Sequence, residues 1–245
     1  MNATHPRRPG RRRFLLTAAA SLALAGTPFA ALAQAGSLKI GIIGTGKIGG
    51  TLAELWATAG YQVLISSRHP EQLQELAKRL GPKVRAGTTQ EAAAFGDVVL
   101  ISVPYGALPQ VGRDYAQELK GKVVLDTGNP YPHRDGAMAE EARTKGTGVA
   151  SAEFLPGMRL VRAFNSIPAA SLRSEAHRSG ERVAIPLASD DPEAVKIAAR
   201  LVQDAGFEPV IVGPLSRAKE FDVGAAVYGR ALTARELRQG LGLAP

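Results

Sequence analysis

The chain has no cysteine among its 245 residues. This absence excludes disulfide bonds, a thiol nucleophile and a zinc–sulfur site, and it suits an oxidising compartment. Histidine is also scarce, and the four that occur (His5, His69, His133 and His177) lack the spacing of metal ligands. We therefore expect no metal site.

Acidic residues are absent from the first 35 residues, which contain five arginines. The sequence Arg11-Arg12-Arg13-Phe14-Leu15 fits the twin-arginine export motif. Residues 14–33 carry no charge, and small residues would allow cleavage near Ala33 or Ala35. The pattern predicts that residues 1–35 are a signal peptide for the twin-arginine export machinery and that the mature protein is periplasmic.

The uncharged run is about long enough to span a bilayer, so a membrane anchor is the competing interpretation. Gly26, Pro28 and many alanines make the run a poor membrane span. We therefore favour cleavage and expect no stable membrane insertion afterwards.

A strong positive charge is missing once this segment is set aside. Five of the 30 Lys and Arg residues lie in it, and the rest of the chain carries 25 basic and 22 acidic residues. No other basic run follows, so we expect no nucleic-acid partner.

Three glycines follow a short apolar run, residues 40–43, in the pattern Gly44-x-Gly46-x-x-Gly49. In a dinucleotide site, the first glycine permits a sharp turn, the second lets the pyrophosphate approach, and the third lets helix and strand pack closely. The alternative is a glycine-rich turn in an unrelated α/β protein. We expect a strand–turn–helix unit with the pyrophosphate at the helix N-terminus. Its cofactor-binding residues would be Gly44, Thr45, Gly46, Lys47, Ile48 and Gly49.

The second apolar run, residues 61–65, ends in Ser66, Ser67 and Arg68, and no acidic residue occurs between Gly60 and Pro70. A site for NAD usually has Asp or Glu at this point, where it binds the ribose 2′-hydroxyl. Ser67 and Arg68 can instead bind a 2′-phosphate, so the sequence predicts NADP(H). The alternative is that Arg68 is a solvated loop charge.

The remaining chain alternates between strand-like and helix-like segments. It predicts an α/β fold, a Rossmann-like doubly wound, mainly parallel sheet in a single domain with a short helical C-terminal tail. We place the NADP-binding domain at 36–222 and the tail at 223–245. Strands are expected at 40–43, 61–65, 84–86, 97–103, 122–126, 160–164, 183–188 and 210–212. Helices are expected from residue 47 and at 70–80, 89–95, 108–119, 137–144, 168–172 and 192–205.

Functional residues of such a sheet lie at the carboxyl ends of its strands. Further candidates for cofactor binding are Ser102, Val103, Pro104, Asn129 and Asn165, and the catalytic candidates are Asn165 and Ser166. Pro104 would turn the chain beneath the ribose and nicotinamide, and the two asparagines would bind the carboxamide or an electron acceptor. The alternative for each asparagine is a turn former that bonds its own backbone.

Several motifs together resemble the coenzyme F420-dependent NADP oxidoreductase family over roughly residues 38–220. They are Ile40-Gly41-Ile42-Ile43-Gly44-Thr45-Gly46 with Ile48-Gly49, Ser67-Arg68, Val103-Pro104, Asp126 with Asn129-Pro130, the stretch 161–169, Gly206-Phe207 and Gly213-Pro214-Leu215. The resemblance implies an eight-stranded doubly wound sheet, often a homodimer, and hydride exchange between NADPH and a deazaflavin. A related module occurs in membrane metalloreductases that pass electrons from NADPH to flavin.

The chain departs from the family at its end. Members that bind the deazaflavin close the site with a longer helical C-terminus, whereas 29 residues follow Ser216 here. NADP(H) binding therefore carries over from the resemblance, while the identity of the acceptor stays open.

Our leading hypothesis is an NADPH-dependent oxidoreductase that exchanges hydride with a small-molecule acceptor, coenzyme F420 or a flavin. Hydride moves directly between stacked rings, so no acid or base is required. The alternative is an exported NADP(H)-binding module that serves a partner redox protein without catalysis of its own. A short-chain carbonyl reductase lacks support, because Tyr105, Tyr115, Tyr131 and Tyr228 are not followed by lysine at the Tyr-x-x-x-Lys spacing.

Overall fold

The computed structural model describes residues 1–3 and 38–244 of the chain. The twin-arginine motif, the uncharged run and both cleavage sites lie outside the described residues, so the signal peptide and the export stay predictions. Within the described residues, no helix combines the length and the apolar character needed to cross a bilayer.

Eight strands form one sheet in the described part, in the order β3-β2-β1-β4-β5-β6-β7-β8. All neighbours pair in parallel except β6 and β7, which meet antiparallel at Arg162 and Ala188. This confirms the α/β fold with a mainly parallel, Rossmann-like sheet. The strands are β1 (Lys39–Ile43), β2 (Gln62–Ser66), β3 (Val84–Gly87), β4 (Val98–Ile101), β5 (Val123–Asp126), β6 (Arg159–Arg162), β7 (Ala184–Ala188) and β8 (Glu208–Gly213).

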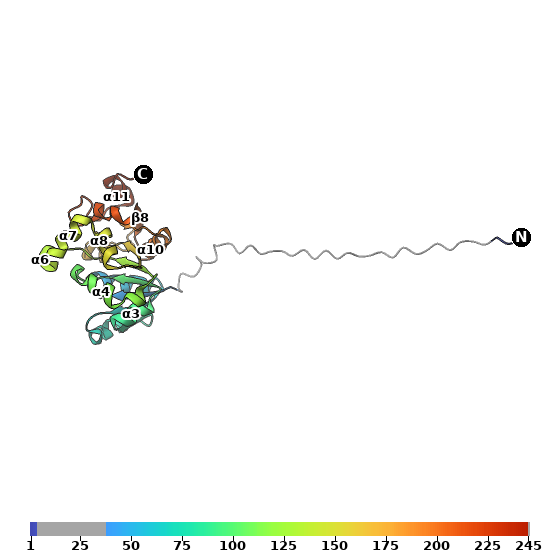
Figure 1. Cartoon of the computed structure of the whole chain (residues 1–245), viewed down its shortest axis with the longest axis horizontal. Coiled ribbons are helices and arrows are strands. Elements are labelled where there is room, and N and C mark those ends of the chain that lie inside the picture. Colours follow the sequence, from blue (N-terminus) through green and yellow to red (C-terminus); the bar gives the residue numbers. More distant parts are fainter. Residues whose placement is uncertain (4–37, 245) are drawn as a thin grey trace. The chain divides into compact units, whose positions relative to one another are not determined.

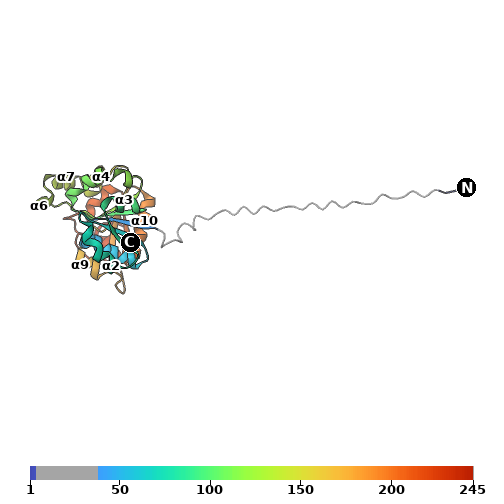
Figure 2. The same ribbon diagram turned by 90° about the horizontal axis from the view of Figure 1, so that it is seen from below.

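Helices cover both faces of the sheet (Figure 1). Figure 2 shows α4 and α7 on one side and α2 and α9 on the other. The α-helices are α1 (Lys47–Thr58), α2 (Gln74–Leu80), α3 (Thr89–Phe95), α4 (Leu108–Asp114), α5 (Ala116–Leu119), α6 (Pro132–Asp135), α7 (Ala137–Lys145), α8 (Thr147–Phe154), α9 (Ala169–Ser174), α10 (Pro192–Asp204) and α11 (Ala234–Gly240). The described residues also form the 3₁₀ helices η2 (Pro70–Leu73), η3 (Tyr105–Ala107) and η4 (Leu215–Phe221).

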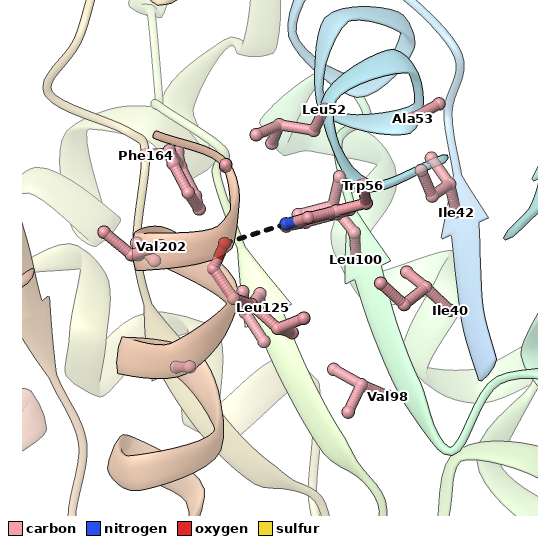
Figure 3. Close-up of a cluster of buried hydrophobic side chains, with 14 of the residues drawn as sticks. Ile40, Ile42, Leu52, Ala53, Trp56, Val98, Leu100, Leu125, Phe164 and Val202 are labelled. Atoms are coloured by element: carbon pink, nitrogen blue, oxygen red, sulfur yellow. Dashed lines mark hydrogen bonds between the residues drawn. The ribbon is translucent and has the colours of Figure 1, made fainter. Parts of the chain in front are cut away.

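The apolar core has one cluster on each face of the sheet. Trp56 of α1 is fully buried in the first cluster, and its indole Nε1 donates to the backbone oxygen of Leu201 in α10 at 2.9 Å (Figure 3). The ring of Phe164 meets Trp56 edge-on, with centroids 6.2 Å apart. These contacts tie the cofactor-binding helix to the second half of the sheet.

Some segments differ from the predicted elements. The helix expected at 108–119 is broken at Tyr115, whose backbone leaves the helical region, and the helix expected at 70–80 begins as a 3₁₀ turn. The sequence did not predict α8, because its buried face is formed by small residues without apolar periodicity. Gly148 explains that composition, since a Cβ there would lie 2.0 Å from the backbone oxygen of Leu215.

The tail packs onto the same sheet. Val227, Leu232, Leu237 and Leu241 are buried with β7 and β8 in a third apolar cluster. The backbone of the tail also pairs with β7, because the amide of Ala184 donates to the oxygen of Leu232 at 2.7 Å. The domain boundary at residue 222 stays a prediction, but residues beyond it share a core with the sheet.

Candidate functional site

The three loop glycines have different surroundings. Gly44 has a φ of +96°, which favours glycine, and a Cβ there would lie 2.4 Å from the backbone oxygen of Ser102. A Cβ on Gly49 would lie 2.1 Å from the oxygen of Gly44, so α1 could not pack against the loop as it does. A Cβ on Gly46 would meet nothing within 4 Å. The open space at the second glycine fits a pyrophosphate, which needs close approach to the backbone there.

The N-terminus of α1 is suited to an anion. Gly46 caps the helix without a side-chain hydrogen bond, and the first turn contains no acidic residue. The helix dipole and the first N–H groups therefore favour a phosphate. Thr45 fixes the loop, since its hydroxyl donates to the backbone oxygen of Ser66 at 2.9 Å.

A cleft of about 630 Å³ opens beside this loop, a volume within the usual range of small-molecule sites. It brings together the ends of β1, β2 and β4, which are distant in sequence. The predicted residues that line it are Gly44, Thr45, Gly46, Ser67, Arg68, Ser102, Val103 and Pro104. Lys47, Ile48, Gly49, Asn129, Asn165 and Ser166 do not line it.

Seven further residues complete the cleft, and the sequence analysis missed them. Ile43 comes from the end of β1 and Thr89 from the start of α3. The others come from η3, α4 and the residue after it: Ala107, Gln110, Val111, Asp114 and Tyr115. Four of these lie at positions 107, 110, 111 and 114, the spacing of one helix face. This face directly follows Pro104, which ends a predicted strand. The helical spacing of residues after that strand end was the signal that could have identified them.

Ser67 and Arg68 follow β2 and form one part of the rim of the cleft. The Ser67 hydroxyl accepts a hydrogen bond from the amide of His69 at 3.0 Å, which leaves its proton available for a ligand. Arg68 is exposed, and its guanidinium has no ion-pair or hydrogen-bond partner among residues 38–244. The acidic residue in the lining, Asp114, comes from α4 and accepts from the Gln110 amide at 2.5 Å. The rim formed by β2 can therefore bind a phosphate without carboxylate repulsion.

A buried ion pair lies under the ends of β5 and β6. Arg162 is fully buried, and its Nη1 donates to the Asp126 carboxylate at 2.5 Å while its Nη2 donates to the Gly128 oxygen at 2.7 Å. Ser151 of α8 donates to the same carboxylate at 2.7 Å. A buried guanidinium is costly unless it is paired, so this set holds the loop after β5 in one conformation.

Tyr105 belongs to the same buried group. Its hydroxyl lies 3.0 Å from that of Ser151, and burial, together with the Asp126 carboxylate, raises the pKa of Tyr105. The phenol therefore stays neutral at physiological pH. Its side chain is fully buried and does not line the cleft.

Asn129 and Asn165 bind each other. The Asn129 amide nitrogen donates to the backbone oxygen of Asn165 at 2.7 Å, and the Asn165 amide nitrogen lies 3.3 Å from Asp222 Oδ1. Asn165 Oδ1 is buried without a hydrogen-bond partner in the described chain. Neither side chain bonds its own turn, and both link the loops after β5 and β6.

The turn that presents Asn165 is strained. Phe164 has a φ of 59°, which is unusual for a bulky residue. Its ring is buried and meets Trp56 and Phe207 edge-on, so packing enforces the backbone conformation. Ser166 is also buried, and its backbone oxygen accepts from the amide of Gly229 in the tail at 2.8 Å.

No group of three or more His, Asp or Glu residues that could hold a metal ion occurs in the described part of the chain. The candidate site comprises the glycine loop, the cleft with its basic rim, and the polar loops after β5 and β6.

Comparison with known proteins fits this arrangement. The family model for coenzyme F420-dependent NADP oxidoreductases matches residues 39–130. The F420-dependent NADP reductase of Methanothermobacter thermautotrophicus is 31% identical over 196 residues, which cover 74% of this chain and 84% of that enzyme. The chain belongs to this family. It is accordingly an NAD(P)-binding oxidoreductase.

Two further matches extend the comparison. Metalloreductase STEAP3 of Rattus norvegicus is 28% identical over 191 residues, which cover 75% of this chain. The match spans 36% of that longer protein. A hypothetical protein of Sinorhizobium meliloti has the same fold, with a TM-score of 0.70 and 27% identity over 80% of this chain and 95% of that one.

Proposed function

We propose that the protein transfers hydride from NADPH to a planar acceptor of the deazaflavin or flavin type. The observation that carries the cofactor part is the rim of the cleft, where Ser67 and the exposed Arg68 stand in place of the carboxylate of an NAD site. The relatives are a metalloreductase and an F420-dependent NADP reductase, and these activities support a redox acceptor as the second substrate.

The chain contributes binding and orientation. The loop at Gly46 and the N-terminus of α1 would hold the pyrophosphate, and Arg68 with Ser67 would hold the 2′-phosphate. Val103 and Pro104 would support the nicotinamide half at the end of β4. NADPH itself supplies the hydride, so the protein needs no general acid or base for the transfer.

The cofactor assignment is tested by titrating NADPH and NADH against the wild type and Arg68→Ala. Loss of a charge-assisted contact should weaken NADPH about 10- to 100-fold and leave the much weaker NADH binding nearly unchanged. Arg235→Ala is the matched control, because that arginine is 80% exposed on α11. Equal NADPH affinity in Arg68→Ala and the wild type would show that Arg68 is only a surface charge.

The acceptor is tested by following NADPH oxidation with coenzyme F420, FMN and a quinone. We expect turnover with the deazaflavin or flavin. Tight NADPH binding without turnover with any of the three would contradict the proposed reaction and favour a binding module that serves a partner.

A further inference from the structure

Two tyrosine hydroxyls meet at the end of β5. Tyr131 follows the Asn129 loop and Tyr228 comes from the tail, 97 positions later, yet their hydroxyl oxygens are 2.7 Å apart. Both side chains are half-buried. The tail thus reaches the end of β5, the strand beside β4, whose end lines the cofactor cleft.

One hydroxyl proton of this pair is not used in a hydrogen bond within the described residues. Tyr228 accepts from the Asn129 amide at 3.3 Å, and one of the two phenols donates to the other. The second phenolic proton has no acceptor among residues 38–244, whichever tyrosine carries it. The pair therefore presents one unused O–H donor.

The donor is held in place from both sides. The backbone amide of Tyr131 donates to Asp135 at 2.9 Å, and the Arg134 guanidinium lies 5.1 Å from its ring centroid. The tail is fastened next to Tyr228, because the Gly229 amide donates to the oxygen of Ser166 at 2.8 Å. Burial and the neighbouring Tyr131 hydroxyl raise the pKa of Tyr228, so the group keeps its proton at neutral pH.

The loop that leads to Tyr131 contacts the lining of the cofactor cleft. Ser102 lines the cleft at the end of β4, and its hydroxyl accepts from Thr127 at the end of the neighbouring β5 at 3.1 Å. A dinucleotide that starts at Gly46 and passes Pro104 would bring its nicotinamide toward the loop of Asn129. Asn129 itself is occupied by protein contacts, whereas the tyrosine pair has a free donor.

We propose that Tyr131 and Tyr228 together donate a hydrogen bond to a carbonyl oxygen of the electron acceptor, so that the tail takes part in acceptor recognition. This inference rests on the proposed function. In the reaction, the C4–H bond of NADPH breaks and the hydride, with its two electrons, forms a new bond to the acceptor ring. NADP⁺ is left, and the reduced acceptor takes one proton from water. Negative charge grows on a conjugated carbonyl oxygen, which a phenol stabilises more in the transition state than in the ground state.

The test compares Tyr131→Phe, Tyr228→Phe and the double variant with the wild type. The measurements are kcat and KM for coenzyme F420, FMN and menadione, all of which carry ring carbonyls, and the Kd of NADPH. Each single variant keeps one phenol with a free proton, so kcat/KM should fall only a few-fold. The double variant has no phenol, and its kcat/KM should fall about 10- to 100-fold with the NADPH Kd unchanged.

Tyr61→Phe is the matched control. It removes a phenol that lies before the first residue of β2 and donates to Asp204 at 2.5 Å, and it should leave kcat/KM unchanged. Wild-type kcat/KM in the double variant would overturn the role of the pair while the proposed function stands. So would a fold-loss in the double variant no larger than the product of the fold-losses in the two single variants. Absence of turnover by the wild type with all three acceptors would overturn both. If the double variant does not fold, a single variant that loses as much NADPH affinity as acceptor kcat/KM would also refute the inference.

Discussion

At the residue scale, two glycines of the cofactor loop have different roles, one in ligand binding and one in packing. Gly46 faces open space and Gly49 faces the backbone of Gly44, although both belong to one short motif. A methyl group at Gly46 would occupy ligand space, whereas a methyl group at Gly49 would collide with the protein. The two positions can therefore be distinguished by experiment.

We predict that Gly46→Ala folds with nearly wild-type stability and binds NADPH at least about 10-fold more weakly, since the new methyl group holds the pyrophosphate away from the loop. Gly49→Ala should lower the free energy of unfolding by roughly 2–4 kcal/mol, because backbone must move to admit the Cβ. Urea unfolding and NADPH titration measure the two effects. A Gly46→Ala variant as unstable as Gly49→Ala would contradict this division.

At the element scale, α10 is joined to β6 through its first turn. Asp191 caps the helix by accepting from the amides of Glu193 and Ala194 at 2.9 and 3.0 Å. The same carboxylate accepts from Arg159 of β6 at 2.6 Å. Since α10 also accepts the Trp56 hydrogen bond, its position affects the helix that begins at the cofactor loop.

This carboxylate should make stability depend on acid pH. The Arg159 hydrogen bond, followed by the helix amides, lowers the pKa of Asp191 in the folded protein. Its stabilisation is therefore present above the unfolded pKa of about 3.9 and is lost as the pH falls below that value.

We expect Asp191→Asn to melt a few degrees below the wild type at pH 6, with the difference shrinking toward pH 3. Asparagine keeps the helix cap and loses the charge, so the comparison isolates the ion pair. Glu193→Gln is the control, because its pair with Lys196 is exposed. Thermal unfolding followed by circular dichroism measures this. A difference that grows on acidification would show the opposite sign and refute the assignment.

At the scale of the whole molecule, the cleft joins segments that are far apart in sequence. The loop after β1, the end of β2 and the helix after β4 each supply part of its lining. A ligand that binds only the folded arrangement stabilises it by mass action.

NADPH at about 100 times its Kd should stabilise the fold by about 2.7 kcal/mol, which corresponds to a rise in Tm of roughly 5–10 °C. NADH at the same concentration should raise the Tm less, because it lacks the phosphate that Arg68 would bind. In the Arg68→Ala variant the difference between the two cofactors should be smaller than in the wild type. Differential scanning fluorimetry checks this, and equal shifts of the wild type with both cofactors would contradict NADP(H) selectivity.

The sequence by itself determined the parts of this protein that depend on local chemistry. The glycine loop needs particular backbone freedom. The presence or absence of a carboxylate at the end of the second strand indicates NAD or NADP, and Asp191-Pro192 starts a helix. Each is expressed within a few neighbouring residues, so the mainly parallel α/β fold and about half of the cleft-lining residues could be predicted. The missed short helices, such as α8, have small buried residues and no apolar periodicity.

Only the tertiary structure decided which distant residues meet. It brought Arg162 to Asp126, turned Asn129 toward the backbone of Asn165, and carried Tyr228 of the tail to Tyr131. These contacts depend on the order of the strands, the antiparallel pairing of β7 with β6 and the left-handed turn at Phe164 that packing enforces. A residue's partners across the sheet leave no periodic trace in the chain, because burial and register select them only after the strands have assembled.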